Sequence, residues 1–316
     1  MDFIDLFAGI GGMRIGFERA GGKCVFSSEI DRHARDTYEE NFTERPHGDI
    51  RLIEAEEIPP HDILLAGFPC QTFSIAGVSK LSSMGLAHGL IEDTRGTLFY
   101  EISRILEHHR PRAFLLENVK GLLWHDEGRT FTKISEILQS LGYEISHKVI
   151  SSVGYVPQRR ERVFIVGFND GTDFQFPSPP ERETKLADIL LAEVSPKYTL
   201  NDHLWNYHQE RKRIQKAKGN GFGFRMFSPE DTSGTLSARY YKDGADILIE
   251  QEGMNPRRLT PRECARLMGF SDEFILNDSE VQSYKQLGNA VVPPVVELIA
   301  REMMHCANNK ETEVEV

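Results

Sequence analysis

The sequence has few cysteines and no long apolar run. Four cysteines occur in 316 residues, and their spacing includes no CxxC pair and no pattern typical of a zinc site. No apolar run approaches the roughly 20 residues that a membrane-spanning helix requires, and no secretory signal precedes the first strand-like run, at residues 2–7. We therefore expect no metal, no membrane contact and a cytoplasmic protein whose cysteines stay reduced.

Positive charge is also scarce overall. The chain has 37 lysines and arginines against 48 aspartates and glutamates, and its formal net charge is −11. Alone, this balance weighs mildly against nucleic acid binding, which usually requires a basic surface. The cations are nevertheless clustered, at residues 159–162, 211–225 and 257–266. Each cluster is either a nucleic acid contact or a solvated helix face, and the sequence leaves both alternatives open.

Strand and helix patterns alternate through the first half of the chain. Helical spacing of apolar residues lies between strand-like runs at residues 3–7, 23–28, 62–66, 113–116, 144–150 and 162–167. This alternation predicts a Rossmann-like α/β fold with a doubly wound, mostly parallel sheet.

The pattern changes after Gly167. A proline-rich stretch follows at 174–180, and the chain to about residue 253 is irregular, basic and rich in glycine. We expect a large domain of residues 1–175 plus 286–316 and a smaller, irregular domain of residues 176–285. A final helix from Pro293 should pack back on the large domain, and the polar tail after Asn308 should be disordered.

A glycine-rich turn, DLFAGIGG at residues 5–12, follows the first strand. Gly9 and Gly11 allow the backbone to turn sharply and to approach a ligand closely, and ligands of doubly wound sheets bind at the carboxyl ends of strands. Glu29 follows the second strand and could accept hydrogen bonds from ribose hydroxyls. Asp49 is expected at the end of a third strand, within reach of an adenine amine. The pattern is compatible with NAD, FAD or S-adenosylmethionine, and also with a tight turn that binds nothing.

Cys70 lies in the segment GFPCQTFS, residues 67–74, directly after a buried strand. This position places the thiol at the carboxyl edge of the sheet, where ligands bind. Cysteine is strongly nucleophilic even when only a small fraction is thiolate. The alternative is a small buried hydrophobic residue, and we accept it for the other three cysteines, Cys24, Cys264 and Cys306.

Two ionisable side chains lie at the ends of other predicted strands. Glu117 directly follows a buried run, where a carboxylate is costly unless it has a task or a partner, and in its protonated form it could donate to N3 of a pyrimidine. Arg162 begins a strand and could hold a carbonyl oxygen by charge-assisted hydrogen bonds. An ion pair with Glu161 is the alternative for the arginines of this run, and it carries more weight for Arg159 and Arg160 than for Arg162.

Seven motifs in order make the chain similar to the cytosine-5 DNA methyltransferases of restriction–modification systems, over nearly its whole length. They are DLFAGIGG (5–12), GFPCQTFS (67–74), DTRGTLFYEI (93–102), LLENVKGL (115–122), QRRERVFIVG (158–167), RRLTPRECARLMGF (257–270) and QLGNAVVPPV (286–295). The resemblance implies that residues 1–175 plus 286–316 bind S-adenosylmethionine and carry out catalysis. Residues 176–285 would form a target-recognition domain and hinge, with duplex DNA between the two.

The resemblance also implies a mechanism and a set of site residues. A cytosine is flipped out of the duplex, Cys70 adds to its carbon 6, and Glu117 and Arg162 engage N3 and the 2-carbonyl. The loop at 75–91 should move as it closes over the DNA. The residues expected to line the cofactor pocket are Phe7, Gly9, Gly11, Glu29, Ile30, Asp49, Ile50, Pro69, Leu98, Asn289 and Val291.

The segments at 219–224 and 236–249 are similar to the recognition region of the Dcm- and EcoRII-like subgroup. That likeness implies methylation of the inner cytosine of a CC…GG-type site such as CC(A/T)GG. The candidate DNA contacts are Ser74, Arg160, Arg225, Arg239 and Lys242. We expect a monomer in a bacterium or phage, located at the nucleoid and acting separately from any cognate restriction endonuclease. The alternatives are an RNA cytosine-5 methyltransferase, a catalytically silent DNA-binding homologue and, from the glycine turn alone, a nicotinamide oxidoreductase.

Overall fold

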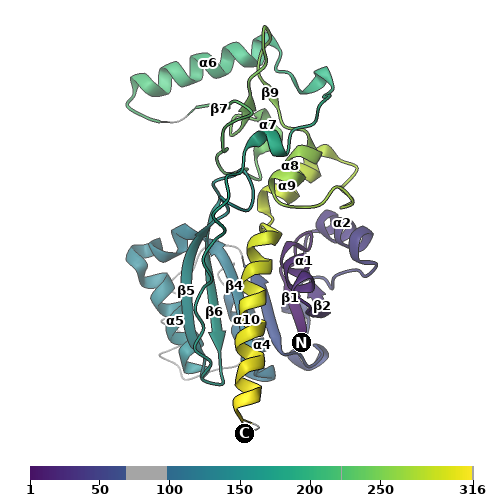
Figure 1. Ribbon diagram of the computed structural model, residues 1–316, viewed down its shortest axis with the longest axis vertical. Coiled ribbons are helices and arrows are strands. Elements are labelled where there is room, and N and C mark those ends of the chain that lie inside the picture. The colour runs from purple at the N-terminus through teal and green to yellow at the C-terminus, as the bar shows by residue number, and fades with distance from the viewer. Residues whose placement is uncertain (69–97, 222, 315–316) are drawn as a thin grey trace.

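The computed structural model describes residues 1–68, 98–221 and 223–314. A six-stranded sheet occupies the lower part of Figure 1, in the order β2-β1-β3-β4-β6-β5. Strands β2, β1, β3 and β4 run parallel, whereas β6 is antiparallel to both of its neighbours. The predicted α/β fold with a mostly parallel sheet is thus confirmed, and each of the six strand-like runs is a strand. Their bounds are β1 Asp2–Leu6, β2 Lys23–Ser28, β3 Ile63–Gly67, β4 Ala113–Val119, β5 Glu144–Ser151 and β6 Glu161–Phe168.

Helices cover both faces of this sheet because its strands alternate apolar residues between two cores. Phe3 of β1 joins the core beneath α1 (Gly12–Arg19) and α10 (Pro293–Val314). Its neighbour Ile4 joins the opposite core, beneath α4 (Leu98–His109) and α5 (Arg129–Ser140). Helices α1 and α10 pack closely, since a Cβ atom at Gly16 would lie only 2.6 Å from Cβ of Val296. The polar tail expected to be disordered instead continues α10 as far as Val314.

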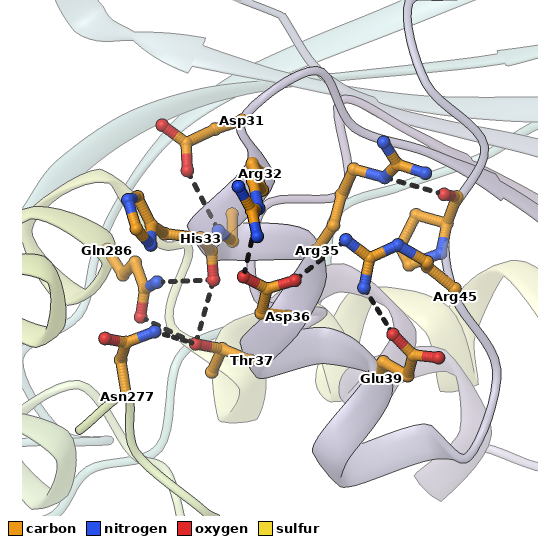
Figure 2. A network of polar contacts seen from close by, with 12 residues as sticks. Asp31, Arg32, His33, Arg35, Asp36, Thr37, Glu39, Arg45, Asn277 and Gln286 are labelled. Carbon is orange, nitrogen blue, oxygen red and sulfur yellow. Dashed lines mark hydrogen bonds and ion pairs between the residues drawn. The ribbon is translucent and has the colours of Figure 1, made fainter. Parts of the chain in front are cut away.

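Helix α2 (Arg32–Phe42) follows β2 and is joined to a distant part of the chain. Its N-cap is Asp31, whose side chain accepts a hydrogen bond from Ala34 N. Figure 2 shows that Thr37 donates from Oγ1 to Oε1 of Gln286 (3.1 Å), and Nε2 of Gln286 donates to the carbonyl of His33 (2.9 Å). Gln286 lies in α9 (Glu280–Asn289). These bonds hold the C-terminal motif beside the first helices.

The upper part of Figure 1 is smaller and contains a three-stranded sheet, β7-β8-β9, with short helices. The core beneath α1 and α10 continues into this part through Leu236, Tyr240 and Leu259. The segment expected to be irregular contains a 16-residue helix, α6. Only His208 of α6 is buried, so its sequence has no apolar stripe to reveal it. The bounds are α6 Asp202–Ala217, β7 Met226–Phe227, α7 Tyr240–Asp243, β8 Leu248–Ile249, β9 Arg257–Arg258 and α8 Pro261–Leu267.

Short 3-10 helices connect these elements. None of the helices in the described ranges is both long enough and apolar enough to cross a membrane. The 3-10 helices are η1 Ile50–Leu52, η2 Ala55–Glu57, η3 Lys120–Leu123, η4 His125–Gly128, η5 Leu186–Asp188 and η6 Pro196–Tyr198.

Candidate active site

The reversed direction of β6 brings two predicted catalytic side chains together. Because β6 runs antiparallel to β4, its first residues lie beside the last residues of β4, and Arg162 pairs with Val119. Nε of Arg162 then lies 3.0 Å from Oε1 of Glu117, and both side chains are largely buried. An acid and an arginine are therefore paired at the carboxyl edge of the sheet.

Burial is the main influence on the Glu117 carboxyl and raises its pKa, although the nearby cations of Arg162 and Arg160 oppose this effect. The carboxyl also faces the end of β3, because a Cβ atom at Gly67 would lie 3.6 Å from Oε2 of Glu117. A carboxylic acid that retains its proton above the usual pH range can donate a hydrogen bond to a ring nitrogen. Glu117 therefore has the character of an acid directed at the end of β3.

Asn118 joins this edge to the segment that carries the cysteine motif. Its Nδ2 donates to the carbonyl of Phe68 (2.9 Å), and its Oδ1 accepts from Val119 N (2.8 Å). Phe68 is the last residue of the motif 67–74 that the structure describes before Cys70, so Asn118 holds the backbone that leads to the cysteine. The expected nucleophile, cofactor contact and DNA contact in this motif, Cys70, Pro69 and Ser74, lie outside the described residues, as does the loop 75–91.

The glycine-rich turn has the geometry of a ligand cradle. Phe7, Gly9 and Gly11 all adopt left-handed backbone conformations, with φ of 56°, 56° and 84°. Gly9 N donates to Oε2 of Glu29 (2.8 Å), and Oε1 of Glu29 accepts from Asp31 N (2.8 Å). Each carboxylate oxygen thus retains capacity to accept a ribose hydroxyl. A Cβ atom at Gly9 would meet nothing within 4 Å.

Two further features of this turn suit an adenosine. The Ile30 side chain, next to Glu29, is 65% exposed and offers an apolar surface at the mouth of the turn. Val291 packs against the turn from the far end of the chain, since a Cβ atom at Gly12 would lie 2.9 Å from its Cγ1. Asn289 is the last residue of α9, two positions before Val291, and its side chain is exposed. The residues present therefore fit S-adenosylmethionine, whose ribose and adenine require acceptors and apolar cover and which has no phosphate.

Asp49 is not at the end of a strand, contrary to the prediction. It caps η1, where its Oδ1 accepts from Arg51 N (3.1 Å) and from Arg51 Nε (2.9 Å). The next strand begins only at Ile63, because residues between them form short 3-10 turns. The Ile50 side chain is buried in the core, and Leu98 begins α4 and is half-buried.

Arg160 has a structural position that contradicts both of its predicted roles. It is only 3% exposed, and its guanidinium donates to the carbonyls of Leu236 (3.0 Å), Gly288 (2.9 Å) and Ala290 (2.8 Å). Burial lowers the pKa of Arg160 to about 9, which leaves it charged at neutral pH. Arg160 therefore neither faces DNA nor pairs with Glu161, whose partner is Lys120.

The third basic cluster is also structural. Nη2 of Arg257 lies 2.8 Å from Oε1 of the fully buried Glu263. Arg266 pairs with Asp272 (2.6 Å), and Arg262 donates to carbonyls of the 271–274 turn. The sequence allowed two alternatives for this cluster, a nucleic acid contact or a solvated face. In the structure these arginines instead bond to other groups of the protein.

The other candidate DNA contacts are exposed in the upper part of the molecule. Arg225 immediately precedes β7, Arg239 is the residue before α7, and Lys242 lies within α7.

Sequence reasoning missed Arg160 and Gln286 as linkers between distant segments. Neither residue carried a signal of this role, because Arg160 stands in the polar run QRRER and Gln286 follows Lys285. Among the described residues, no group of His, Cys, Asp and Glu side chains is arranged to hold a metal ion.

The comparisons with known proteins agree with this geometry. The family model described as C-5 cytosine-specific DNA methylase matches residues 1–305. The chain is 51% identical over 310 residues to the type II methyltransferase M.DsaV of Dactylococcopsis salina, covering 96% of this chain and 86% of that one. It is 44% identical over 361 residues to the DNA-cytosine methyltransferase of Escherichia coli (strain K12), covering 95% and 76%.

Solved structures show the same fold. The Dnmt2 methyltransferase of S. pombe has a TM-score of 0.78 and 20% sequence identity to this chain, covering 98% of this chain and 99% of that one. A second neighbour, a methyltransferase of Entamoeba histolytica, has a TM-score of 0.74. Family match, identity and fold agree, and the chain belongs to the C-5 cytosine-specific DNA methylases, which are S-adenosylmethionine-dependent DNA (cytosine-5) methyltransferases.

Proposed function

We propose that this enzyme methylates a cytosine flipped out of duplex DNA, with Cys70 as the covalent nucleophile and Glu117 and Arg162 as the groups that activate the ring. The observation that carries the proposal is the buried Glu117–Arg162 pair at the carboxyl edge of the sheet. Phe68, which Asn118 holds at this edge, belongs to the cysteine motif and precedes Cys70 by two positions. The three side chains would thus meet around one base.

The chemistry explains why such a set is needed. Carbon 5 of cytosine is too electron-poor to attack a methyl sulfonium. When the Cys70 thiolate bonds to carbon 6, negative charge develops on the ring, and protonated Glu117 stabilises it at N3 while Arg162 holds the 2-carbonyl oxygen. Carbon 5 then has enamine character and would take the methyl group as its bond to the sulfonium breaks, which leaves S-adenosylhomocysteine as the product. Loss of the carbon 5 proton to a base breaks the carbon–sulfur bond and releases the thiolate.

We assign the methyl donor to the glycine-rich turn. S-adenosylmethionine supplies an electrophilic methyl group on its sulfonium when it is bound. Glu29 would hold the ribose hydroxyls, because its two oxygens, which accept from Gly9 N and Asp31 N, have further lone pairs to offer. Ile30 would cover the adenine, and Asn289 and Val291 would close the pocket from the C-terminal side. The other members of the predicted set are Phe7, Gly9, Gly11, Asp49, Ile50, Pro69 and Leu98.

We further propose that residues 176–285 recognise the DNA sequence and that the target is the inner cytosine of a CC…GG-type site such as CC(A/T)GG. Arg225, Arg239 and Lys242 are exposed on this part and have the donors that read base edges in the major groove. The target cytosine is stacked inside the duplex and must be flipped out before it can react. Flipping costs a few kcal/mol. The enzyme would act as a monomer, separately from any cognate endonuclease.

Bisulfite sequencing of DNA from cells that express this chain tests the target directly. We expect protected cytosines at the second position of CC…GG sites, and uniform conversion throughout the DNA would contradict the proposal. Methyl transfer to duplex DNA and to tRNA should be measured side by side, and transfer to tRNA alone would reassign the substrate.

The role of the thiol needs a matched variant. Cys70→Ser should abolish methyl transfer while duplex DNA affinity stays within about twofold, because the serine hydroxyl is far less nucleophilic. The control is Cys306→Ser, in α10, which should retain full turnover. Normal turnover of Cys70→Ser would exclude the covalent mechanism.

A further inference from the structure

Helix α6 without its first residue, Asp202, and the described residues after it form the basic arm, defined as residues 203–221 and 223–225. The arm has one acidic residue, Glu210, in a chain with a net charge of −11. Positive charge is thus concentrated in the arm, whereas the rest of the chain is acidic. The six cations of the arm are Arg211, Lys212, Arg213, Lys216, Lys218 and Arg225.

Only the first half of α6 is fixed by packing. His208 is buried and lies 3.3 Å from the Asp243 carbonyl through its Nε2. Trp205 packs on Phe224 with ring centroids 4.8 Å apart. From residue 209 to residue 221 every side chain except that of Gln215 is exposed. A helix end with so little apolar packing gains little stability from the rest of the protein.

Most of the cations on the arm are not neutralised. Arg213 pairs with Glu210 (2.7 Å), and Arg211 lies 3.8 Å from Asp243. Lys212 lies over the Phe224 ring, 4.1 Å from its centroid. Within the described parts of the chain, no carboxylate lies in ion-pair range of Lys212, Lys216, Lys218 or Arg225.

The position of the arm suits a ligand that extends beyond the active site. Figure 1 shows α6 at the far end of the upper part, on the side where α5 and β5 lie below it. The same upper part carries the predicted base contacts Arg239 and Lys242. With 16 residues, α6 is about 24 Å long, which equals roughly seven base-pair steps of duplex DNA.

We propose that the cations of the basic arm other than Arg225, which the proposed function assigns to base recognition, bind phosphates of duplex DNA outside the recognition sequence. The inference rests on the proposed function, because it assumes that duplex DNA is the substrate. An acidic chain repels the DNA backbone, and a local group of unpaired cations offsets that repulsion and retains the duplex. Lysines are flexible point charges and suit phosphates, which carry no sequence information. The arm therefore supplies affinity without specificity.

The test compares Lys216→Gln/Lys218→Gln with a control of equal charge, Lys23→Gln/Lys148→Gln, whose lysines are exposed on β2 and β5. Affinity for a long duplex that contains the site is measured by fluorescence anisotropy between about 50 and 200 mM salt. The slope of log K against log salt should become shallower by about 2 in the arm variant and stay unchanged in the control. Turnover at saturating DNA should not change.

A second measurement uses duplexes of different length and sequence. The arm variant should lose affinity equally for cognate and non-cognate long duplexes, and its deficit should disappear on a duplex trimmed to the recognition site. An unchanged slope on the long duplex would overturn the proposal and would point to another partner for the arm, such as an acidic protein. A deficit that persists on the trimmed duplex would also overturn it. Failure of the wild-type enzyme to methylate any duplex would instead refute the proposed function.

Discussion

Arg160→Met should be one of the most destabilising single substitutions in this protein. The Arg160 guanidinium joins three carbonyls from two segments, Leu236 in the upper part and Gly288 and Ala290 in the C-terminal motif. Methionine has a similar length and fills most of the space, but it donates no hydrogen bond. The substitution therefore tests the bonds rather than the packing.

The magnitude follows from counting lost partners. Each buried carbonyl that loses its partner costs about 1–3 kcal/mol, so three cost about 3–9 kcal/mol. Removal of the buried charge, which Arg162 repels, returns part of this cost. We expect the free energy of unfolding to fall by about 3–5 kcal/mol. Unfolding in urea, followed by circular dichroism, measures this value.

The neighbouring Arg159 provides the control. It is exposed, and Arg159→Met keeps the backbone bonds of this segment, including Arg159 N to the Ser233 carbonyl (2.9 Å). We expect Arg159→Met to change the stability by less than about 0.5 kcal/mol. If the two variants have the same free energy of unfolding, the three bonds contribute nothing and the structural role assigned to Arg160 is wrong.

Three other predictions concern buried groups. Burial raises the pKa of Asp5 from 3.8 to about 8, so the folded state binds its proton more tightly and stability should fall by roughly 1.4 kcal/mol per pH unit between about pH 4 and 8. Urea unfolding of Asp5→Asn should show a much flatter pH dependence, and an unchanged slope would count against this account. In Gly288→Ala the new methyl group would overlap the backbone of Ala238 and should cost at least about 2 kcal/mol, whereas Gly121→Ala, with open space, should not lower the thermal midpoint. Glu117→Gln should reduce kcat by about 10²–10⁴-fold with DNA affinity retained, and wild-type kcat should fall as the pH rises through the raised pKa of Glu117. A kcat near that of the wild type would exclude Glu117 as the acid.

Local patterns sufficed for most of the sheet and its covering helices. The runs at 3–7 and 23–28 are short and contain several apolar residues, and both are strands within a residue. Helices α6 and α9 were not predicted. Helix α6 has a single buried side chain, and helical periodicity is visible only when one face packs against a core.

The side-chain roles divide in the same way. The sequence by itself determined that Glu117 and Arg162 lie at strand ends, since each borders an apolar run, and the ordered motifs identified the family. Only the tertiary structure decided that the two side chains meet, because that contact requires β6 to enter the sheet antiparallel to β4. It also decided that Arg160 is a buried link between distant segments, whereas the lysines of the basic arm are exposed. Charge pattern is local, but the burial of a side chain and its choice of partner depend on residues that are 76 to 130 positions away in the case of Arg160.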